Sequence, residues 1–97
     1  MTAYVVMIRN ETLDPAGLAQ YAALARDAPI DKLELVASSK TSKLQVLEGP
    51  EPEAVVIMRF PTMSDALEWY NSDAYQKALP HRLAAGNYRA FLVDGTN

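Results

Sequence analysis

Runs of apolar residues separated by polar stretches predict four strands in this chain. The runs are β-branched or aromatic-rich and five to seven residues long, which is typical of strands rather than helices. They lie at Ala3–Arg9, Leu33–Ala37, Ala54–Phe60 and Tyr88–Val93.

Helical spacing of apolar residues fills the two longer gaps between these strands. Asp14 followed by Pro15 is a helix-start signal, and the pattern predicts a helix over Pro15–Arg26. A second helix begins after Thr62, which can cap it. Asn71-Ser72 interrupts this helix, and Pro80 is expected to kink or end the piece that follows.

Polar residues mark the remaining turns. Residues 38–43 form a polar bend, after which Leu44–Leu47 is expected to resume extended structure. Proline, glycine and glutamate dominate residues 48–53, and this composition predicts a turn. Gly86-Asn87 predicts another turn, directly before the last strand.

The order of these elements predicts an α+β fold. A β-α-β-β-α-β sequence is that of the ferredoxin-like split βαβ, an antiparallel sheet with both helices on one face. We expect residues 1–97 to form one domain, with strand order 4-1-3-2 and the first and third strands parallel in the centre.

The strands are apolar on both faces, and this predicts a homodimer. Tyr4, Val6 and Ile8 alternate with Val5 and Met7 in the first strand. A sheet that is covered on one face only should alternate apolar and polar residues. A second copy of the chain, packed sheet against sheet, is the simplest cover for the other face.

Composition and charge exclude several classes of function. The net charge is −3, so a sequence-independent nucleic-acid binder is not expected. The chain contains no cysteine, which excludes disulfides, thiolate catalysis and cysteine-ligated zinc. No apolar run has the ~20 residues that cross a membrane, and the N-terminus lacks a basic leader region. We therefore expect a cytoplasmic protein with no membrane contact.

Several short motifs resemble one family of small proteins. They include Phe60-Pro61-Thr62 and the stretch Trp69-Tyr70-Asn71-Ser72-Asp73-Ala74-Tyr75-Gln76, together with Val46-Leu47-Glu48-Gly49 and the closing Leu92-Val93-Asp94-Gly95. Over nearly its whole length the chain is similar to the domain of unknown function 1330 family, in the dimeric α+β barrel superfamily. The resemblance implies the ferredoxin-like fold and a sheet-to-sheet dimer, and it brings no established reaction.

The resemblance also implies where a ligand would bind. In related barrel families the ligand lies between the helices and the concave face of the sheet. Tyr70, Tyr75 and Arg82 match recurring positions of the family and are the first candidates for a cleft lining. The wider set of aromatic residues that could line a cleft with a polar tip comprises Tyr4, Tyr21, Trp69, Tyr70, Tyr75 and Tyr88. Core packing is the alternative for Trp69 and Tyr70, and it is favoured more for Trp69 than for Tyr75.

Three arginines form a second candidate site. Arg9 and Arg59 end the first and third strands, and Arg89 begins the last. If the first and third strands are parallel, all three lie at one end of the sheet, beside the starts of both helices. Converging guanidinium groups and helix N-termini favour a carboxylate or phosphate. Ordinary surface ion pairs are the alternative, with Glu11, Asp14 or Asp65 as partners.

His81 is the only histidine and therefore the default candidate for acid–base catalysis. No acidic residue lies close to it in sequence, and a surface histidine is the simpler interpretation. One histidine cannot form a zinc site without cysteine or several carboxylates, so we expect no metal and no cofactor.

Three functions remain open at this stage. The first is a dimeric barrel that binds a small organic ligand, an anionic one if the arginines take part. The second is a cofactor-independent enzyme of monooxygenase or isomerase type, which rests on fold analogy alone. The third is an effector-binding module that acts with a DNA-binding partner.

Overall fold

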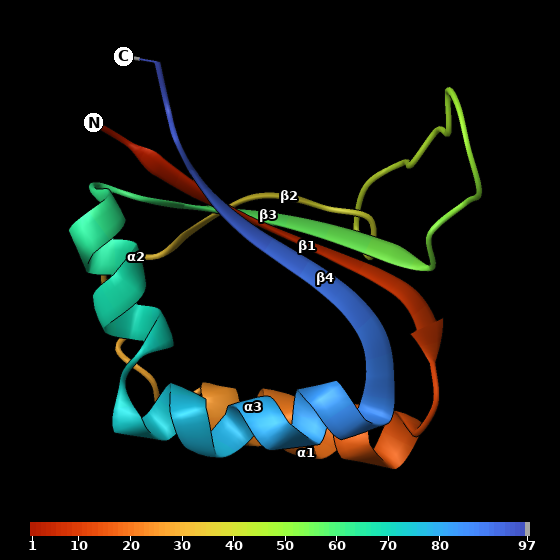
Figure 1. The fold of residues 1–97 in the computed structure, drawn as a ribbon, viewed down its shortest axis with the longest axis horizontal. Coiled ribbons are helices and arrows are strands. Elements are labelled where there is room, and N and C mark those ends of the chain that lie inside the picture. Colours follow the sequence, from red (N-terminus) through yellow and green to blue (C-terminus); the bar gives the residue numbers. More distant parts are fainter. Residues whose placement is uncertain (97) are drawn as a thin grey trace.

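The computed structural model describes residues 1–96 as one four-stranded sheet and three helices (Figure 1). Its elements, in chain order, are β1 (Ala3–Thr12), α1 (Pro15–Ala25), β2 (Glu34–Ser38), β3 (Ala54–Phe60), α2 (Met63–Tyr70), α3 (Asp73–Ala85) and β4 (Gly86–Asp94). The β-α-β-β-α-β order is confirmed, with the second helical region divided in two. The break falls at Asn71-Ser72, where it was expected.

The strand order is β2-β3-β1-β4, which is the expected 4-1-3-2 order read from the opposite edge. One part of the expectation was wrong, because β1 and β3 are antiparallel. Ala3 lies opposite Phe60, and Arg9 lies opposite Ala54. The crossover through α1 returns the chain parallel to β1 in β2, and the next reversal turns β3 against both.

The register sorts the strand residues onto two faces of the sheet. Val5 pairs with Met58 and with Leu92, and these side chains face the helices. Val6, next along β1, pairs with Ile57 and with Phe91 on the opposite face. The outer face is therefore apolar as well, as the strand pattern predicted.

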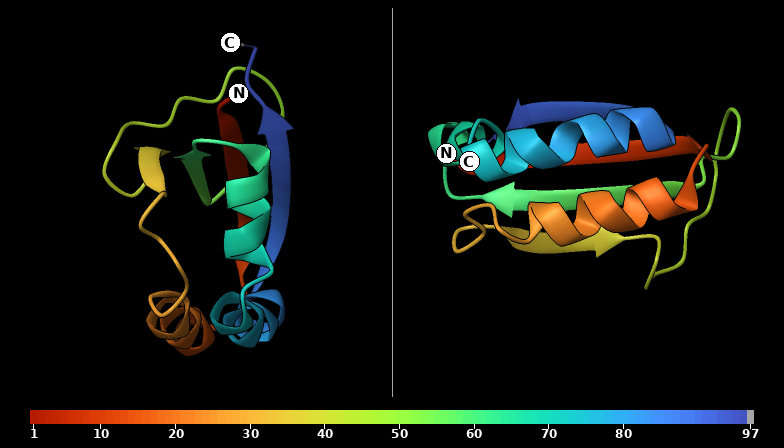
Figure 2. Two further views of the ribbon diagram at one scale, coloured as in Figure 1. Left: turned by 90° about the vertical axis from the view of Figure 1, so that its left-hand side faces the viewer. Right: turned by 90° about the horizontal axis from the view of Figure 1, so that it is seen from below.

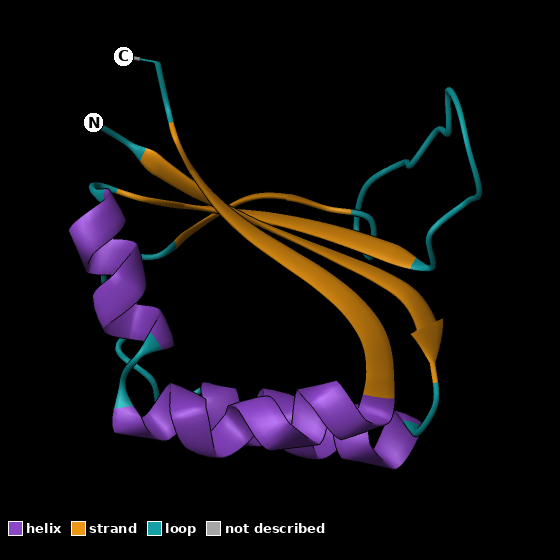
Figure 3. Ribbon diagram, viewed as in Figure 1, coloured by secondary structure: helices purple, strands orange, loops and turns teal. Residues whose placement is uncertain are grey.

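All three helices lie on one side of the sheet (Figures 1 and 3). The helices α1 and α3 run side by side as a layer facing the sheet, and α2 stands at one end of it (Figure 2). The two long helices approach closely at Gly17, because a Cβ built there would lie 2.9 Å from the Cβ of Ala85. Small residues thus hold the helix layer together.

Capping residues start each helix as the sequence indicated. The Asp14 side chain accepts a hydrogen bond from the Ala16 backbone, and Thr62 accepts one from the Asp65 backbone. Pro80 does not end this helix, since α3 continues through it to Ala85. Proline removes one backbone hydrogen bond, and packing of α3 against α1 outweighs that loss.

Two other local expectations were wrong. Leu44–Leu47 belongs to a long loop without regular structure, and Gly86-Asn87 begins β4 directly instead of forming a turn. The loop between β2 and β3 projects beyond the sheet (Figure 1), and Leu47 in it is 87% exposed. Its many polar, proline and glycine residues offer few apolar contacts to a strand.

The apolar core occupies one end of the space between sheet and helices. Phe60, Trp69 and Tyr75 form its aromatic centre, with ring centroids 5.4 Å apart for Phe60–Trp69 and 4.4 Å apart for Trp69–Tyr75. In contrast, α1 has no fully buried residue. Its inner face therefore borders open space, and this space is the candidate site.

Within residues 1–96, no helix is both long enough and apolar enough to span a bilayer. The cytoplasmic location stays a prediction from the sequence.

Candidate functional site

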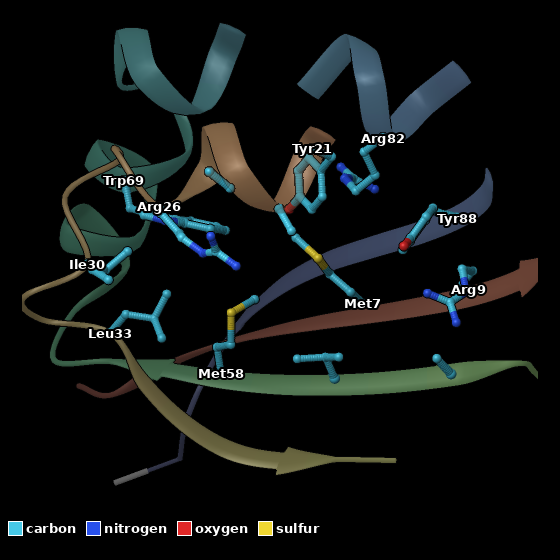
Figure 4. Close-up of a pocket in the computed structure, with 14 residues that line it drawn as sticks. Met7, Arg9, Tyr21, Arg26, Ile30, Leu33, Met58, Trp69, Arg82 and Tyr88 are labelled. Atoms are coloured by element: carbon cyan, nitrogen blue, oxygen red, sulfur yellow. The ribbon is translucent and has the colours of Figure 1, made fainter. Parts of the chain in front are cut away.

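A cavity of about 320 Å³ lies between the sheet and α1 (Figure 4). Its apolar walls come from the inner faces of β1 and β3, from α1 and from the segment before β2. They include Met7, Val56, Met58, Ile30, Leu33 and Trp69. Polar groups on its lining are few, namely Arg9, Tyr21, Arg26, Arg82 and Tyr88. A mostly apolar hollow with a few placed polar groups is typical of small-molecule sites.

Arg82 is the most unusual residue on this lining. It lies in the last turn of α3, is only 2% exposed, and its Nε has no hydrogen-bond partner among the described residues. Its guanidinium carbon lies 4.9 Å from the centroid of the Tyr88 ring and 5.8 Å from that of Tyr21. Arginines are almost never buried unless they are paired. The three ion pairs found within residues 1–96 all involve other residues.

Arg9 approaches the same end of the cavity from β1. It lies opposite Tyr88 in the register of β1 and β4, and its Nε donates to the Glu53 carboxylate at 3.1 Å. The Tyr88 hydroxyl and then Glu53 raise the pKa of Arg9, so Arg9 stays protonated and positively charged. The Thr12 backbone also donates to Glu53, at 2.9 Å. Arg9 is therefore already neutralised, whereas Arg82 has no ion-pair partner among the residues that the structure describes.

A pair of tyrosine hydroxyls lies beside Arg82. The oxygens of Tyr21 and Tyr75 are 2.8 Å apart and share a hydrogen bond. Burial, and then the neighbouring Tyr75, raise the pKa of Tyr21 far above its ordinary value. Tyr21 therefore stays neutral and offers the cavity a hydroxyl group rather than a phenolate.

The first candidates from the sequence lie in different parts of the structure. Arg82 lies on the cavity lining, whereas Tyr75 is fully buried and reaches the lining only through Tyr21. Tyr70 borders a smaller hollow of about 180 Å³ between α2 and β4. Trp69 packs in the core, as expected, and also lines both hollows.

The expected meeting of three arginines was wrong. Arg59 lies opposite Tyr4, at the far end of the sheet from Arg9, because β1 and β3 are antiparallel. Arg89 is near Arg9 along the sheet, but it pairs with Ile8 and so points to the outer face, over Phe91 at 5.0 Å. The two helix starts, after β1 and after β3, are separated in the same way.

The expected surface ion pairs exist with other partners. Arg9 pairs with Glu53, and Arg59 donates to Glu34 at 3.2 Å from its Nε. Asp65, expected to pair with an arginine, accepts from Lys32 at 3.1 Å.

His81 does not line the cavity. It borders a separate depression between α1 and α3, where Asp14 and Gln20 are also found. No histidine, aspartate or glutamate is among the described residues that line the cavity itself. Within residues 1–96 no cluster of three such side chains is arranged for a metal ion.

Among the aromatic residues considered from the sequence, Tyr21, Trp69 and Tyr88 lie on this lining. Several apolar lining residues were not identified from the sequence, including Met7, Ile30 and Leu33. Strand parity is the signal that could have found Met7, since it shares a face of the sheet with Val5 and Arg9. Leu33 precedes β2 and carries no comparable signal.

Comparisons with solved structures support the fold. The chain superposes on a protein of unknown function from Rhodopseudomonas palustris with a TM-score of 0.71 and 20% identity, covering 99% of this chain and 83% of that one. A dimeric ferredoxin-like protein of unknown function from Thermobifida fusca gives 0.63 and 13%, covering 98% and 92%. SnoaB, a cofactor-independent oxygenase from Streptomyces nogalater, gives 0.56 and 13%, covering 99% and 93%. At these identities the likeness concerns the fold alone.

No curated protein matches the chain. The family model described as a domain of unknown function (DUF1330) matches residues 2–96, nearly the whole length. The resemblance inferred from the Trp-Tyr-Asn-Ser stretch is thus confirmed, and the chain belongs to the DUF1330 family.

Proposed function

We propose that the protein binds a small organic anion in the cavity between the sheet and α1, with Arg82 as the counter-charge. The observation that carries this proposal is the buried guanidinium of Arg82, whose Nε has no hydrogen-bond partner within residues 1–96. Leaving a buried polar group unpaired costs about 1–3 kcal/mol, and more for a charged one. A ligand that supplies the missing acceptor and the missing charge recovers that cost.

The surroundings of Arg82 favour a planar anionic group. Tyr21 and Tyr88 flank the guanidinium, and cation–π contacts orient it without neutralising it. A guanidinium presents parallel N–H donors that match the two oxygens of a carboxylate. The apolar walls lower the local dielectric constant, so the attraction is stronger than it would be in water.

A cofactor-independent enzyme is the alternative function. SnoaB is described as a cofactor-independent oxygenase, and the Tyr21 hydroxyl beside Arg82 could stabilise a developing oxyanion. The described lining has no carboxylate or imidazole to accept a proton, however. Binding is therefore the better-supported function, and substrate turnover would be the finding that favours the alternative.

Trp69 provides a direct test, because it is the only tryptophan of the chain and lines the cavity. We would titrate a panel of aryl and alkyl carboxylates, sulfonates and phosphates while recording tryptophan fluorescence. At least one anion should bind the native protein about 10- to 100-fold more tightly than Arg82→Met, the range of a lost charge-assisted hydrogen bond. Arg59→Met, at the other end of the sheet, is the matched control. If no anion prefers the native protein over Arg82→Met, the proposal is wrong.

We further propose that two copies associate through the outer face of the sheet. The three helices cover only the inner face (Figure 3), and the outer face carries apolar side chains from three strands. Among them, Phe91 is 43% exposed and Val93 is 53% exposed. The Thermobifida fusca relative is described as dimeric, which agrees with this arrangement.

Sedimentation velocity of a charged variant tests the dimer. Phe91→Lys places a charge in the proposed interface and should weaken association by tenfold or more. Leu83→Lys is the control, because Leu83 is 60% exposed on α3, away from the sheet. A native protein that sediments as a monomer at micromolar concentration would contradict the proposal.

A further inference from the structure

The cavity is divided into a charged end and an apolar end. Figure 4 shows Arg82, Tyr88 and Arg9 together on one side, with Ile30 and Leu33 on the other, where the solvent-exposed Arg26 is the one charged neighbour among the labelled residues. The division follows from the sheet register. Met7 and Met58 occupy inner-face positions between the two ends, one on each central strand.

The charged end carries a net charge of about +1. Arg9 and Arg82 contribute two positive charges, and the Glu53 carboxylate on Arg9 removes one of them. A single negative charge on a ligand therefore neutralises this end. A second one would have to lie in the apolar end or displace Glu53.

The apolar end offers little to a second charge. Leu33, Met58 and Trp69 form its walls, and none of these side chains carries a charged group. Arg26 is also on the lining, but it is exposed to solvent, so its attraction for an anion is screened. Desolvating a second carboxylate against Leu33 and Met58 costs more than this screened attraction returns.

We propose that the ligand is an amphipathic monocarboxylate. This inference rests on the proposed anion binding and adds the class of the ligand and its orientation. The carboxylate lies on Arg82, and the apolar chain or ring extends past Met7 and Met58 toward Leu33. The cavity of about 320 Å³ is at the lower end of the usual range for small-molecule sites, which favours a short chain or a single ring.

A homologous series of straight-chain acids tests this class by isothermal titration calorimetry with the full-length protein. Butanoate, hexanoate and octanoate differ only in methylene groups. Each buried methylene is worth about 0.8 kcal/mol, which corresponds to roughly a fourfold gain in affinity. We expect the affinity to rise by about that factor per methylene until the apolar end is filled.

Two further ligands separate the contributions of charge and chain. Octan-1-ol has the chain without the charge, and octanedioate has a second carboxylate at the far end. Both should bind at least tenfold more weakly than octanoate. Equal affinity for octanedioate would contradict the monocarboxylate, and equal affinity for octanol would contradict anion binding itself.

A variant at the apolar end makes the failure of the two proposals distinguishable. Leu33→Ser should flatten the dependence on chain length while leaving butanoate affinity nearly unchanged. Leu47→Ser, in the projecting loop, is the matched control and should alter neither. If another anion of the panel binds through Arg82 but alkanoate affinity does not rise with chain length, the inference is wrong and anion binding stands. If nothing binds through Arg82, the proposed function fails as well.

Discussion

The Arg82 guanidinium lies 4.9 Å over the ring of Tyr88, although neither residue was expected to touch the other. Arg82 closes the last turn of α3, and Tyr88 is the third residue of β4. The direct junction of helix and strand at Gly86 folds the tyrosine back beneath the arginine. A buried charge is thus held against an aromatic face, and no acid in the described part of the chain pairs with it.

We expect Arg82→Met to separate stability from ligand binding. Methionine fills similar volume without a charge, and it removes the unmet hydrogen bond of the buried Nε. The contact with Tyr88 that is lost is worth about 0.5–2 kcal/mol, a range similar to the cost that is relieved. The free energy of unfolding of Arg82→Met in urea should therefore equal or exceed that of the native protein. A loss above about 2 kcal/mol would instead make Arg82 a structural residue.

The hydroxyl pair of Tyr21 and Tyr75 leads to a second prediction. Tyr21→Phe leaves the Tyr75 hydroxyl buried without its partner, which should lower the free energy of unfolding by about 1–3 kcal/mol. The double variant Tyr21→Phe/Tyr75→Phe removes both hydroxyls and should recover much of this loss. A double-mutant cycle from urea unfolding measures the coupling. Additive losses would show that the hydroxyls do not interact.

Much of this fold could be predicted from strand patterns, because each strand must satisfy two faces of the sheet. Val5 and Val6 are apolar neighbours on opposite faces, and that alone indicated a second apolar surface. The error in strand direction arose from connectivity rather than composition. A crossover followed by a reversal makes β3 antiparallel to β1, and this separates Arg59 from Arg9.

The candidate site was less predictable, since it depends on a distance between layers. Arg82 could be selected as a candidate, but nothing local indicates that α1 borders a cavity instead of filling it. The close contact of Gly17 with Ala85 joins α1 to α3, and the space beneath α1 follows from that packing. Residues such as Leu33 and Tyr21 become lining only through this tertiary arrangement.

Acid should destabilise the fold through three carboxylates, of which Glu34 and Glu53 are exposed and Asp65 is partly buried. Hydrogen bonds from Arg59 and from Thr12 lower the pKa of Glu34 and of Glu53 respectively, and Lys32 does the same for Asp65. A carboxyl whose pKa is lower in the folded state stabilises the protein above its unfolded pKa, near pH 4, and this contribution is lost as the pH falls further. The free energy of unfolding should therefore decline from pH 5 to pH 3.

The Glu53→Gln variant measures how much of this decline in the free energy of unfolding comes from the Glu53 carboxylate. It should show a shallower loss of stability between pH 5 and pH 3 than the native protein, as measured by urea unfolding. Glu51→Gln changes an exposed neighbour that has no ion pair within residues 1–96, and it serves as the control. Equal slopes for Glu53→Gln and the native protein would contradict the role of the Thr12 and Arg9 contacts.

The close approach of α1 and α3 leads to the last prediction. In Gly17→Ala the new Cβ would lie 2.9 Å from the Ala85 Cβ, a distance that two carbon atoms cannot keep, so the helices must separate. Overpacking of this kind costs about 1–3 kcal/mol, against about 1 kcal/mol gained from the helix propensity of alanine. Thermal unfolding should therefore show a lower midpoint for Gly17→Ala. Adding Ala85→Gly restores the space between the helices. The midpoint of the double variant should therefore be higher than the sum of the two single-variant effects predicts. If Ala85→Gly brings no recovery, another contact, such as that with Asp14, limits position 17.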